Sequence, residues 1–394
     1  MLIQEKVNQA KEILKEFDID CWITFARESQ INGDPTLAFL ITGDITWHSA
    51  FVITKSSKTC AFVGRYDHKT VEETGAFDTV TGYVKSIKED LQDYLKKINP
   101  GQIALNYSEG SEICDGLTHG MYLILYNYLD EINLADRIIS AESIISALRE
   151  RKSHVEIQNI KQAIHITEEI FEETAQYIES GKTENEIAEF MQQAVSNRGL
   201  ELAWDPKLCP SVFTGPDTAE AHFAPTDKEI EKGHIVNIDF GVKFNGYCSD
   251  MQRTFYVLQD DEIKAPDEVQ HGFDTIVKAI DLAKQSIFAG AIGMDVDAVA
   301  REVVITAGYD EFPHALGHQI GRYSHDGTAL LGPGWEKYAK KPYQKLEKNM
   351  VFTIEPRLTV PDHGIVTMEE IIIIGEDGAE FLSNPQTELI LIGS

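Results

Sequence analysis

Apolar positions recur with two different periods along the chain, and each period predicts one kind of element. Over the first 17 residues, apolar side chains return every three or four positions among Glu and Lys, which predicts an amphipathic helix. Short apolar runs and helical patterns then follow, and we expect strands at 20–25, 50–54, 59–63 and 102–106 and helices at 85–98 and 117–128. This alternation predicts an α/β domain over residues 1–140.

Residues 141–394 show longer helical patterns, and part of the pattern occurs twice. Long amphipathic helices are expected at 156–180 and 269–289. Each leads into a helix bounded by glycines with the same spacing of 18 residues, first Gly181–Gly199 and then Gly290–Gly308. The pattern is compatible with a duplicated helix–helix–sheet unit and with chance similarity between two helical hairpins, and both interpretations stay open at this point.

The length and charge of the chain restrict what it can be. A chain of 394 residues is long enough for two domains. We place the boundary in the stretch 141–152, where charged residues cluster, and divide the chain into domains 1–140 and 141–394. The formal net charge of −29 would repel a polyanion, so nucleic acid is not an expected partner.

The remaining composition indicates a cytoplasmic protein. The sequence has no run of 18 apolar residues that would predict a membrane span, and the amphipathic start of the chain does not have the pattern of a signal peptide. The five cysteines are scattered, and their odd number and spacing argue against a disulfide framework. We therefore expect a reducing compartment and no contact with a membrane.

The clearest local pattern is a β-hairpin. Apolar residues alternate over 234–244, Asn245-Gly246 supplies two residues that tolerate positive φ, and a return strand follows at 247–257. A two-residue loop fixes the register, so each residue of the first strand has one defined partner on the second.

This register brings two acidic residues together. Asp239 is expected opposite Gln252 and Gly241 opposite Asp250, which makes the two aspartates diagonal neighbours on one face. Such neighbours are about 7–8 Å apart at Cα, within reach of a shared small ion. Because this face is polar and the other is apolar, it fits either the solvated outer side of a sheet or a metal site.

Three further features favour the metal site. His314 and His318 are four residues apart, but the prolines and glycines around them argue against a helix, so only one needs to be a ligand. Glu355 ends an apolar strand, and Glu369 stands at the start of a β-branched strand, with the adjacent Glu370 as its nearest alternative. Buried carboxylates without partners are protonated or destabilising, so several gathered together need cations.

Five residues resemble, in order and spacing, the metal ligands of the pita-bread metallopeptidases: Asp239, Asp250, His318, Glu355 and Glu369. This family includes methionine aminopeptidase, aminopeptidase P, prolidase and creatinase. The sequences around the five residues are also similar to the family, namely Asn-Ile-Asp-Phe-Gly, Asp-Met-Gln-Arg-Thr-Phe, Gly-His-Gln-Ile-Gly and Thr-Ile-Glu-Pro. The resemblance covers about 140–392. It implies an α+β pita-bread domain, with a curved antiparallel sheet and an internal pseudo-twofold duplication, after a creatinase N-terminal-like α/β domain.

The resemblance also implies two divalent metal ions. Four carboxylates and one imidazole, with no thiolate, suit Mn²⁺ first and also Co²⁺, Fe²⁺ or Zn²⁺. Asp250 and Glu369 would bridge the ions, Asp239 would complete the shell of one ion, and His318 and Glu355 would complete the other. A hydroxide shared by the ions would attack the scissile carbonyl, and Glu355 would accept its proton.

Two other histidines match positions of the same family around the substrate. His222 lies 17 residues before Asp239, and His325 lies seven residues after His318. The resemblance implies that these two hydrogen-bond to the scissile carbonyl or oxyanion and deliver a proton to the leaving imino group. His314 would line the substrate pocket.

The sequence departs from the family pattern near the last ligands. The prolidase and aminopeptidase P branch commonly has an arginine two residues before the final glutamate, where this chain has Thr367. Arg357 occurs instead where the family usually has glycine, and Arg322 where it often has an apolar residue. The segment 326–349 is close enough to the ligands in sequence to form a lid or specificity loop.

The function implied by the resemblance is hydrolysis of the Xaa-Pro bond at the N terminus of dipeptides or short peptides. Proline lacks an amide hydrogen and fixes φ, so this bond needs a dedicated site. The alternatives are a creatinase-like hydrolase or lyase on the same scaffold and a non-catalytic binding module, although both typically lose ligands that this chain keeps. A nucleotide-binding α/β protein has no phosphate loop to support it. The expected partners are a small peptide and, as is common in this branch, a second copy in a homodimer.

Overall fold

The structure, a computed structural model, describes residues 2–217 and 223–393. The chain divides into two compact units, Met1–Arg149 and Glu150–Ser394. Among the described residues, none of the helices combines the length and the apolar character that crossing a membrane requires.

Helix α6 (Glu142–Glu150) determines where the first unit ends. Its Ile145 and Leu148 are buried in an apolar core of the first unit, so the helix needs that core to cover its apolar face. The division therefore falls at the end of α6, inside the stretch 141–152 and beyond residue 140.

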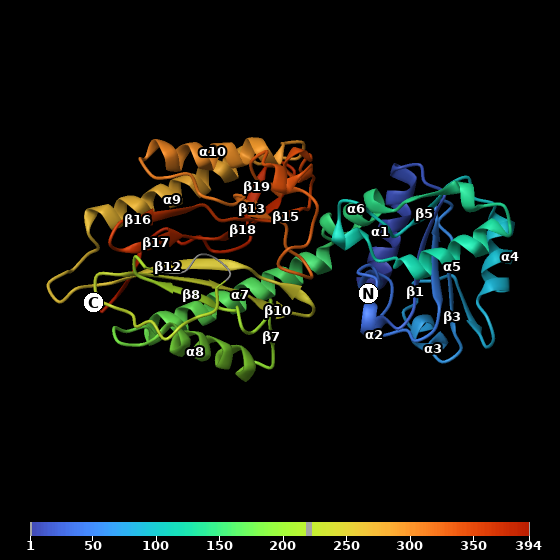
Figure 1. The fold of residues 1–394 in the computed structure, drawn as a ribbon, viewed down its shortest axis with the longest axis horizontal. Helices are drawn as coiled ribbons and strands as arrows, with labels where there is room; N and C mark the ends of the chain where they lie inside the picture. The colour runs from blue at the N-terminus through green and yellow to red at the C-terminus, as the bar shows by residue number, and fades with distance from the viewer. Residues whose placement is uncertain (1, 218–222, 394) are drawn as a thin grey trace. The chain divides into compact units, whose positions relative to one another are not determined.

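The first unit is built on a six-stranded mixed sheet with helices on both faces (Figure 1). Strand β1 (Cys21–Ala26) has a mostly apolar sequence because both of its faces are buried. Cys21 and Ile23 are buried in one core, whereas Trp22 and Ala26 are buried in the other. A strand covered on both faces has no solvent side to carry polar residues. The α/β architecture predicted for this part of the chain is confirmed.

The strands of this sheet are, in spatial order, β4 (Thr79–Tyr83), β3 (Thr59–Gly64), β2 (Ser49–Thr54), β1, β5 (Ile103–Leu105) and β6 (Ile138–Ser140). The other helices of the unit are α1 (Leu2–Glu16), α2 (Ser29–Asn32), α3 (His68–Glu72), α4 (Lys88–Ile98) and α5 (His119–Asp130).

The second unit places two helix pairs on opposite sides of a group of mostly antiparallel strands (Figure 1). The helices are α7 (His154–Tyr177), α8 (Glu184–Asn197), α9 (Asp267–Ser286) and α10 (Gly293–Thr306). The strands are β7 (Glu201–Leu202), β8 (Ser211–Thr214), β9 (Ile235–Phe240), β10 (Val242–Phe244), β11 (Tyr247–Cys248), β12 (Met251–Val257), β13 (Gly317–His318), β14 (Leu330–Leu331), β15 (Val351–Ile354), β16 (Arg357–Val360), β17 (Gly364–Thr367), β18 (Glu370–Ile374), β19 (Ala379–Phe381) and β20 (Ile390–Ile392).

The two helix pairs are tied by matching hydrogen bonds to the connections that precede β9 and β15. The N–H of Gly181 donates to the carbonyl of Ile230 at 2.8 Å, and the N–H of Gly290 donates to the carbonyl of Leu346 at 2.7 Å. In each half, the residue after the glycine accepts a bond in return, at 2.7 and 2.8 Å. A hairpin then follows in both halves, β9 with β12 and β15 with β18. These repeated contacts favour the duplicated unit over chance similarity.

The register predicted for the central hairpin is confirmed. Asp239 on β9 lies opposite Gln252 on β12. Asn245 and Gly246 both have positive φ, at 49° and 78°, as a tight two-residue turn of this hand requires.

The same hairpin is not the pair of continuous strands that the pattern predicts. Its outer part, β10 with β11, belongs to a small sheet with β7, whereas β9 and β12 pair with β8 and β20. The strand breaks at Gly241, where a Cβ atom would collide with the carbonyl oxygen of Ser249. The chain can therefore bend here only because the residue is glycine.

Candidate metal centre

The two aspartates of the central hairpin are turned into the second unit. Asp239 lies near the end of β9, and Asp250 lies immediately before β12. Asp250 is only 6% exposed, and Oδ1 of Asp239 is buried. The polar face of the hairpin is therefore an interior face rather than the solvated side of a sheet.

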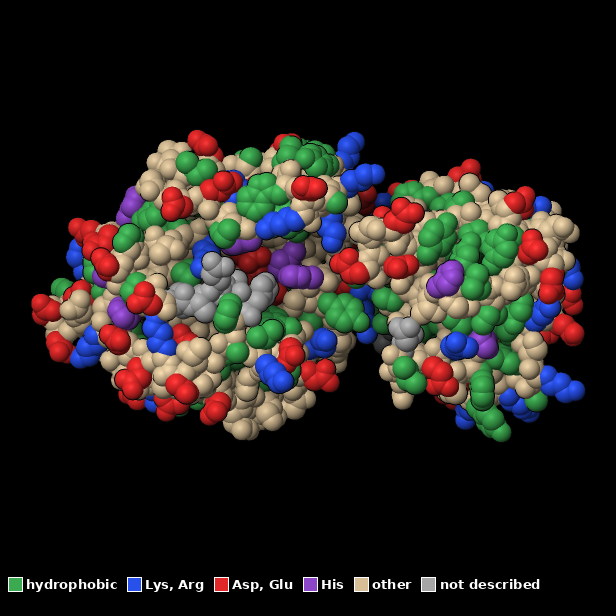
Figure 2. Space-filling view, viewed as in Figure 1, with side chains coloured by type: hydrophobic (Ala, Val, Ile, Leu, Met, Phe, Trp, Pro, Cys, Tyr) green, Lys and Arg blue, Asp and Glu red, His purple; other side chains and the backbone are tan. Residues whose placement is uncertain are grey.

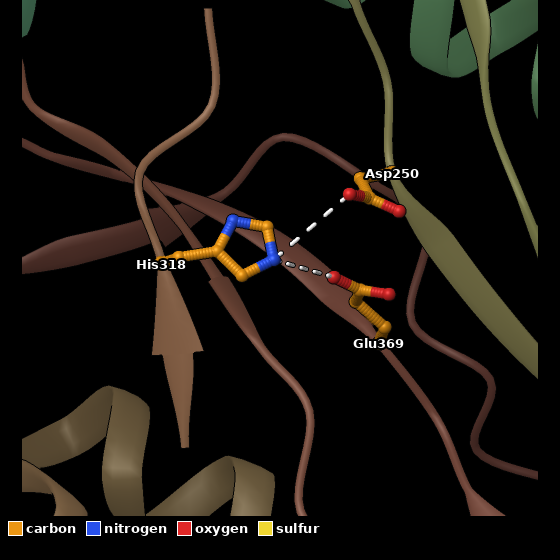
Figure 3. A group of neighbouring side chains, drawn as sticks. All are labelled: Asp250, His318 and Glu369. Atoms are coloured by element: carbon orange, nitrogen blue, oxygen red, sulfur yellow. Dashed lines mark ion pairs between the residues drawn. The ribbon is translucent and has the colours of Figure 1, made fainter. Parts of the chain in front are cut away.

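Three other elements bring their side chains to this face. His318 is the last residue of β13, Glu355 directly follows β15, and Glu369 stands between β17 and β18. The Nε2 atom of His318 is 3.4 Å from Glu355 Oε1, 3.8 Å from Glu369 Oε1 and 3.9 Å from Asp250 Oδ2. Figure 3 shows the imidazole pointing toward Asp250 and Glu369 from the opposite side of the site.

Gln252 joins the two glutamates. Its Nε2 donates to Glu355 Oε2 at 3.1 Å and to Glu369 Oε2 at 3.0 Å, and its backbone carbonyl accepts from the N–H of Glu369 at 3.2 Å. Each glutamate then has its other oxygen directed at His318. The predicted register placed Gln252 opposite Asp239, but nothing in the sequence pattern indicated that it holds the two glutamates.

The electrostatics of the cluster are unfavourable without a cation. Burial raises the pKa of Asp239 to about 7. Burial also raises the pKa of Asp250, Glu355 and Glu369 well above the usual range, and the negative charges of neighbouring carboxylates raise each of them further. Four ionised carboxylates in one buried place need positive charge beside them.

The donor set fits divalent cations. Asp239 Oδ1 and Glu369 Oε1 are buried and have no hydrogen-bond partner among the described residues. Carboxylate oxygens and one imidazole nitrogen suit hard or borderline ions, and ion coordination would satisfy these oxygens. Figure 2 shows the same region as a hollow in the second unit, with acidic side chains at its floor and histidine beside them.

The structure separates Glu369 from its neighbour Glu370. Arg253 donates to both carboxylate oxygens of Glu370, at 2.9 and 3.3 Å, and Ser383 and the N–H of Gln386 donate to them as well, at 2.6 and 2.9 Å. Glu370 is therefore neutralised inside the protein, whereas Glu369 faces the other carboxylates. Adjacent strand residues point to opposite faces, which explains the difference.

The histidines expected around the substrate have different positions. The ring of His325 lies against that of His318, with centroids 4.1 Å apart. His222 lies outside the described residues. His314 Nδ1 is 2.8 Å from the carbonyl of Ala315, and burial lowers the pKa of His314 to about 4. His314 is therefore a neutral ring whose Nδ1–H donates to that carbonyl.

A buried ion pair that sequence reasoning missed holds the loop before His318. Arg301 donates two hydrogen bonds to Asp297, at 2.7 and 2.8 Å, and two more to the carbonyls of Phe312 and His314, at 2.7 and 2.9 Å. Asp297 accepts in turn from the N–H of Leu316 at 3.0 Å. An Asp–Arg pair four residues apart on a helix was the available signal, but such pairs are usually exposed and weak.

The residues that depart from the family pattern have identifiable neighbours in the structure. Arg357 on β16 is the direct cross-strand partner of Thr367 on β17. The guanidinium of Arg322 lies 5.3 Å from the ring of Tyr247. Within the segment 326–349, β14 pairs with the strand that carries His318, so this part of the segment belongs to the frame of the site. A lid role for the remainder stays a prediction.

Comparison with known families identifies the class of this protein. The sequence profile of metallopeptidase family M24 matches residues 158–376, which is more than half of the chain. The chain belongs to this family. All five residues predicted as metal ligands lie inside the matched range, as do Gln252 and the ion pair of Asp297 with Arg301.

Individual relatives match about two thirds of the chain. A peptidase of Staphylococcus epidermidis whose function is uncharacterized is 32% identical over 241 residues, which are 61% of this chain and 64% of that protein. A Xaa-Pro dipeptidase of Pyrococcus furiosus is 29% identical over 271 residues, which are 68% of this chain and 73% of that protein. The match therefore spans just under two thirds of the staphylococcal relative.

Solved structures are similar over almost the whole chain. An X-Pro aminopeptidase from Thermotoga maritima superposes with a TM-score of 0.74 and 26% identity, covering 96% of this chain and 99% of that one. A Xaa-Pro dipeptidase from Bacillus anthracis superposes with a TM-score of 0.76 and 23% identity, covering 99% and 100%. The fold is that of an N-terminal α/β unit followed by a pita-bread unit, which confirms the fold predicted from the sequence.

Proposed function

We propose that this chain is a two-metal peptidase that hydrolyses the Xaa-Pro bond at the N terminus of dipeptides or short peptides. The observation that carries the proposal is the convergence of four buried or half-buried carboxylates and one imidazole from separate elements, with no Lys or Arg of the described residues paired with these carboxylates. Membership of a metallopeptidase family supports the reaction type, and the similarity to an X-Pro aminopeptidase and a Xaa-Pro dipeptidase supports the bond cleaved.

Five side chains would hold the two ions: Asp239, Asp250, His318, Glu355 and Glu369. We expect Mn²⁺ first, with Co²⁺, Fe²⁺ or Zn²⁺ as alternatives. When bound, such ions acidify a water molecule and polarise the scissile carbonyl. The protein contributes fixed positions for the ligands, because Gln252 holds the second oxygen of Glu355 and of Glu369.

The remaining side chains move protons and orient the peptide. The side chain of Glu355 is 17% exposed at the edge of the cluster, so it is placed to accept the proton of an attacking water. His325 lies beside His318 and would donate to the oxyanion or to the leaving imino nitrogen, a role that it would share with His222. The neutral ring of His314 would form an uncharged wall beside the substrate.

A reconstitution experiment tests the proposal. The protein is stripped of metal, loaded with Mn²⁺ or Co²⁺, and assayed with Xaa-Pro dipeptides, Xaa-Pro-Xaa tripeptides and matched Xaa-Ala controls. We expect two ions per chain and release that depends on proline. Two bound ions without cleavage of any peptide would instead favour a non-peptidase hydrolase or lyase, and no bound metal would favour a binding module.

Two expectations remain predictions. A homodimer is expected from the resemblance to the prolidase branch, and sedimentation velocity would test it. A cytoplasmic location is expected from the composition and cysteine pattern.

A further inference from the structure

The loop that carries His325 connects β13 with β14. His318 of β13 is paired with Leu330 of β14, so the chain between them forms a hairpin loop. Within the loop, the N–H of Asp326 donates to the carbonyl of Gln319 at 2.8 Å. The ring of His325 packs on the ring of His318, with centroids 4.1 Å apart. The place of the His325 ring therefore depends on what fixes the residues that follow it in the loop.

Glu150 provides a hydrogen-bond acceptor for this loop from a distant part of the chain. Its Oε1 atom accepts from the N–H of Thr328 at 2.7 Å and from the hydroxyl of the same residue at 2.6 Å. Thr328 lies three residues after His325, and 178 positions separate it from Glu150. Glu150 is only 2% exposed, so water does not compete for these bonds. One buried carboxylate oxygen therefore fixes the loop shortly after His325.

The chain next to Glu150 also reaches this loop. Lys152 is buried, with 1% of its surface exposed. A Cβ atom on Gly321 would lie 2.8 Å from Lys152 Nζ and 2.2 Å from Asp326 Oδ2. The ammonium and the carboxylate therefore share the space that the absence of a side chain at Gly321 leaves. The connection after Glu150 thus lies against the residue that directly follows His325.

The same pair of bonds occurs locally elsewhere in the second unit. Glu186 Oε2 accepts from the N–H of Thr183 at 2.8 Å and from its hydroxyl at 3.1 Å, across three positions of the chain. This arrangement is the capping box at the start of α8, and it fixes only the end of that helix. The bonds of Thr328 to Glu150 instead hold together two segments that are far apart in the sequence.

The burial of Glu150 makes the position of the loop costly to change. A buried carboxylate that loses its hydrogen-bond donors destabilises the protein. Movement of Thr328 away from Glu150 would cause such a loss, because both bonds end on one oxygen atom. An apolar side chain in the same place would fill the space but would set no direction for the backbone. Glu150 therefore favours one position of the loop over others.

We propose that Glu150 is a positioning residue for His325. By holding Thr328, it keeps the loop in place and the imidazole of His325 against that of His318, where it would donate to the oxyanion or to the leaving nitrogen. The catalytic part of this inference rests on the proposed function. The structural part concerns only the hold of Glu150 on the loop, so it can be tested without a substrate.

Hydrogen exchange of the full chain tests whether Glu150 holds the loop. Glu150→Leu removes the acceptor, and we expect amide exchange at 325–330 to become about 10-fold faster. Glu150→Gln keeps an oxygen acceptor in the same place and should exchange like the unaltered protein. Glu186→Leu is the matched control, because it removes the same two bonds of a threonine and should leave 325–330 unchanged. Unchanged exchange at 325–330 in Glu150→Leu would overturn the inference.

A double-mutant cycle tests whether Glu150 acts through His325. With the Mn²⁺-loaded protein and Ala-Pro, Glu150→Leu should lower kcat by about 10- to 100-fold, because a misplaced acid loses much of its effect in the transition state. KM and metal content should stay as they are, and Glu150→Gln should recover most of kcat. In the His325→Ala background, Glu150→Leu should have almost no further effect on kcat. Additive losses, or a fall in metal content together with kcat, would show that Glu150 supports the unit as a whole and would overturn its assignment to His325.

Two substitutions of Thr328 test the same bonds if Glu150→Leu does not fold. Thr328→Val removes the hydroxyl bond and keeps the N–H bond, so exchange at 325–330 should become about threefold faster. Thr328→Ser keeps both donors and should match the unaltered protein, and equal exchange in these two variants would count against the inference. If the unaltered protein cleaves no Xaa-Pro peptide, the proposed function fails, whereas faster exchange in Glu150→Leu still supports the hold of Glu150 on the loop.

Discussion

Both units of this protein contain buried carboxylates, but the two units provide different partners for them. In the first unit, Asp34 lies in a polar cluster with hydrogen-bond donors on every side. In the second unit, Asp239, Asp250 and Glu369 face one another. Both groups are buried, so burial by itself does not indicate a functional site.

The cluster of the first unit is complete within the protein. Asp34 accepts from the N–H and the hydroxyl of Thr36, at 2.8 and 2.6 Å, and from Asn106 Nδ2 at 2.8 Å. The indole N–H of Trp22 donates to Asn106 Oδ1 at 2.6 Å. Burial raises the pKa of Asp34, but these donors oppose the rise. The cluster needs no ligand, and we regard it as structural.

In the second unit, a carboxylate with partners and a carboxylate without them are adjacent in the sequence. Glu370 has Arg253 as its partner and is complete, whereas the adjacent Glu369 has a buried oxygen without a partner among the described residues. The two kinds of buried carboxylate therefore differ in whether the protein provides them with hydrogen-bond donors and positive charge. Buried carboxylates that the protein leaves to repel one another form a site for a cation.

The largest effect is expected from breaking the incomplete cluster. Asp250→Asn keeps the shape of the side chain but removes charge, and we expect peptide hydrolysis to fall by on the order of 10³-fold. Metal content, measured by elemental analysis after dialysis, should fall with it. Asp281→Asn on the exposed side of α9 is the matched control and should change neither quantity. Full metal content in Asp250→Asn would contradict the ligand assignment.

The second largest effect is expected from breaking the ion pair of Arg253 with Glu370, which lies beside Glu369. Arg253→Met leaves the buried carboxylate of Glu370 without its counter-charge, which should lower the free energy of unfolding by about 3–5 kcal/mol. Urea unfolding of the metal-free protein measures this. Arg198→Met breaks a more exposed pair with Glu173 and should cost only about 0–1 kcal/mol. Equal losses of unfolding free energy in the two variants would contradict the expectation that breaking a buried ion pair costs more than breaking an exposed one.

Metal removal sharpens the comparison between the units. A ligand that binds only the folded state at 1,000 times its Kd stabilises it by about 4 kcal/mol. Chelation should therefore lower the melting temperature of the second unit, and proteolysis of the chelated protein should begin within residues 150–394. An Asp250→Asn protein should respond little to the chelator. A response confined to the first unit would argue against the assigned site.

The smallest effect is expected in the first unit. Asn106→Ala leaves the indole N–H of Trp22 and one oxygen of Asp34 short of partners, at a cost of about 1–3 kcal/mol. The metal content should not change. Asn8→Ala on the exposed face of α1 is the control and should stay within about 0.5 kcal/mol of the unaltered protein. Loss of metal in Asn106→Ala would show that the polar cluster is not merely structural.

The sequence by itself determined the local geometry and the family. The Asn245-Gly246 turn fixed the pairing of Asp239 with Gln252, because a two-residue loop allows one register. The long helices at α7 and α9 followed from their apolar stripes, because a helix must cover one face. The order of acidic residues and histidine pointed to the metallopeptidases before any contact was known.

Only the tertiary structure decided which polar residues act together. The pattern could not say whether the polar face of the hairpin was inside or outside, or that Gln252 holds two glutamates from a distant part of the chain. It could not choose between Glu369 and Glu370 from composition, nor place Arg357 opposite Thr367. Local backbone rules extend over a few residues, whereas burial, hydrogen-bond supply and neighbouring charge depend on segments more than 100 residues apart.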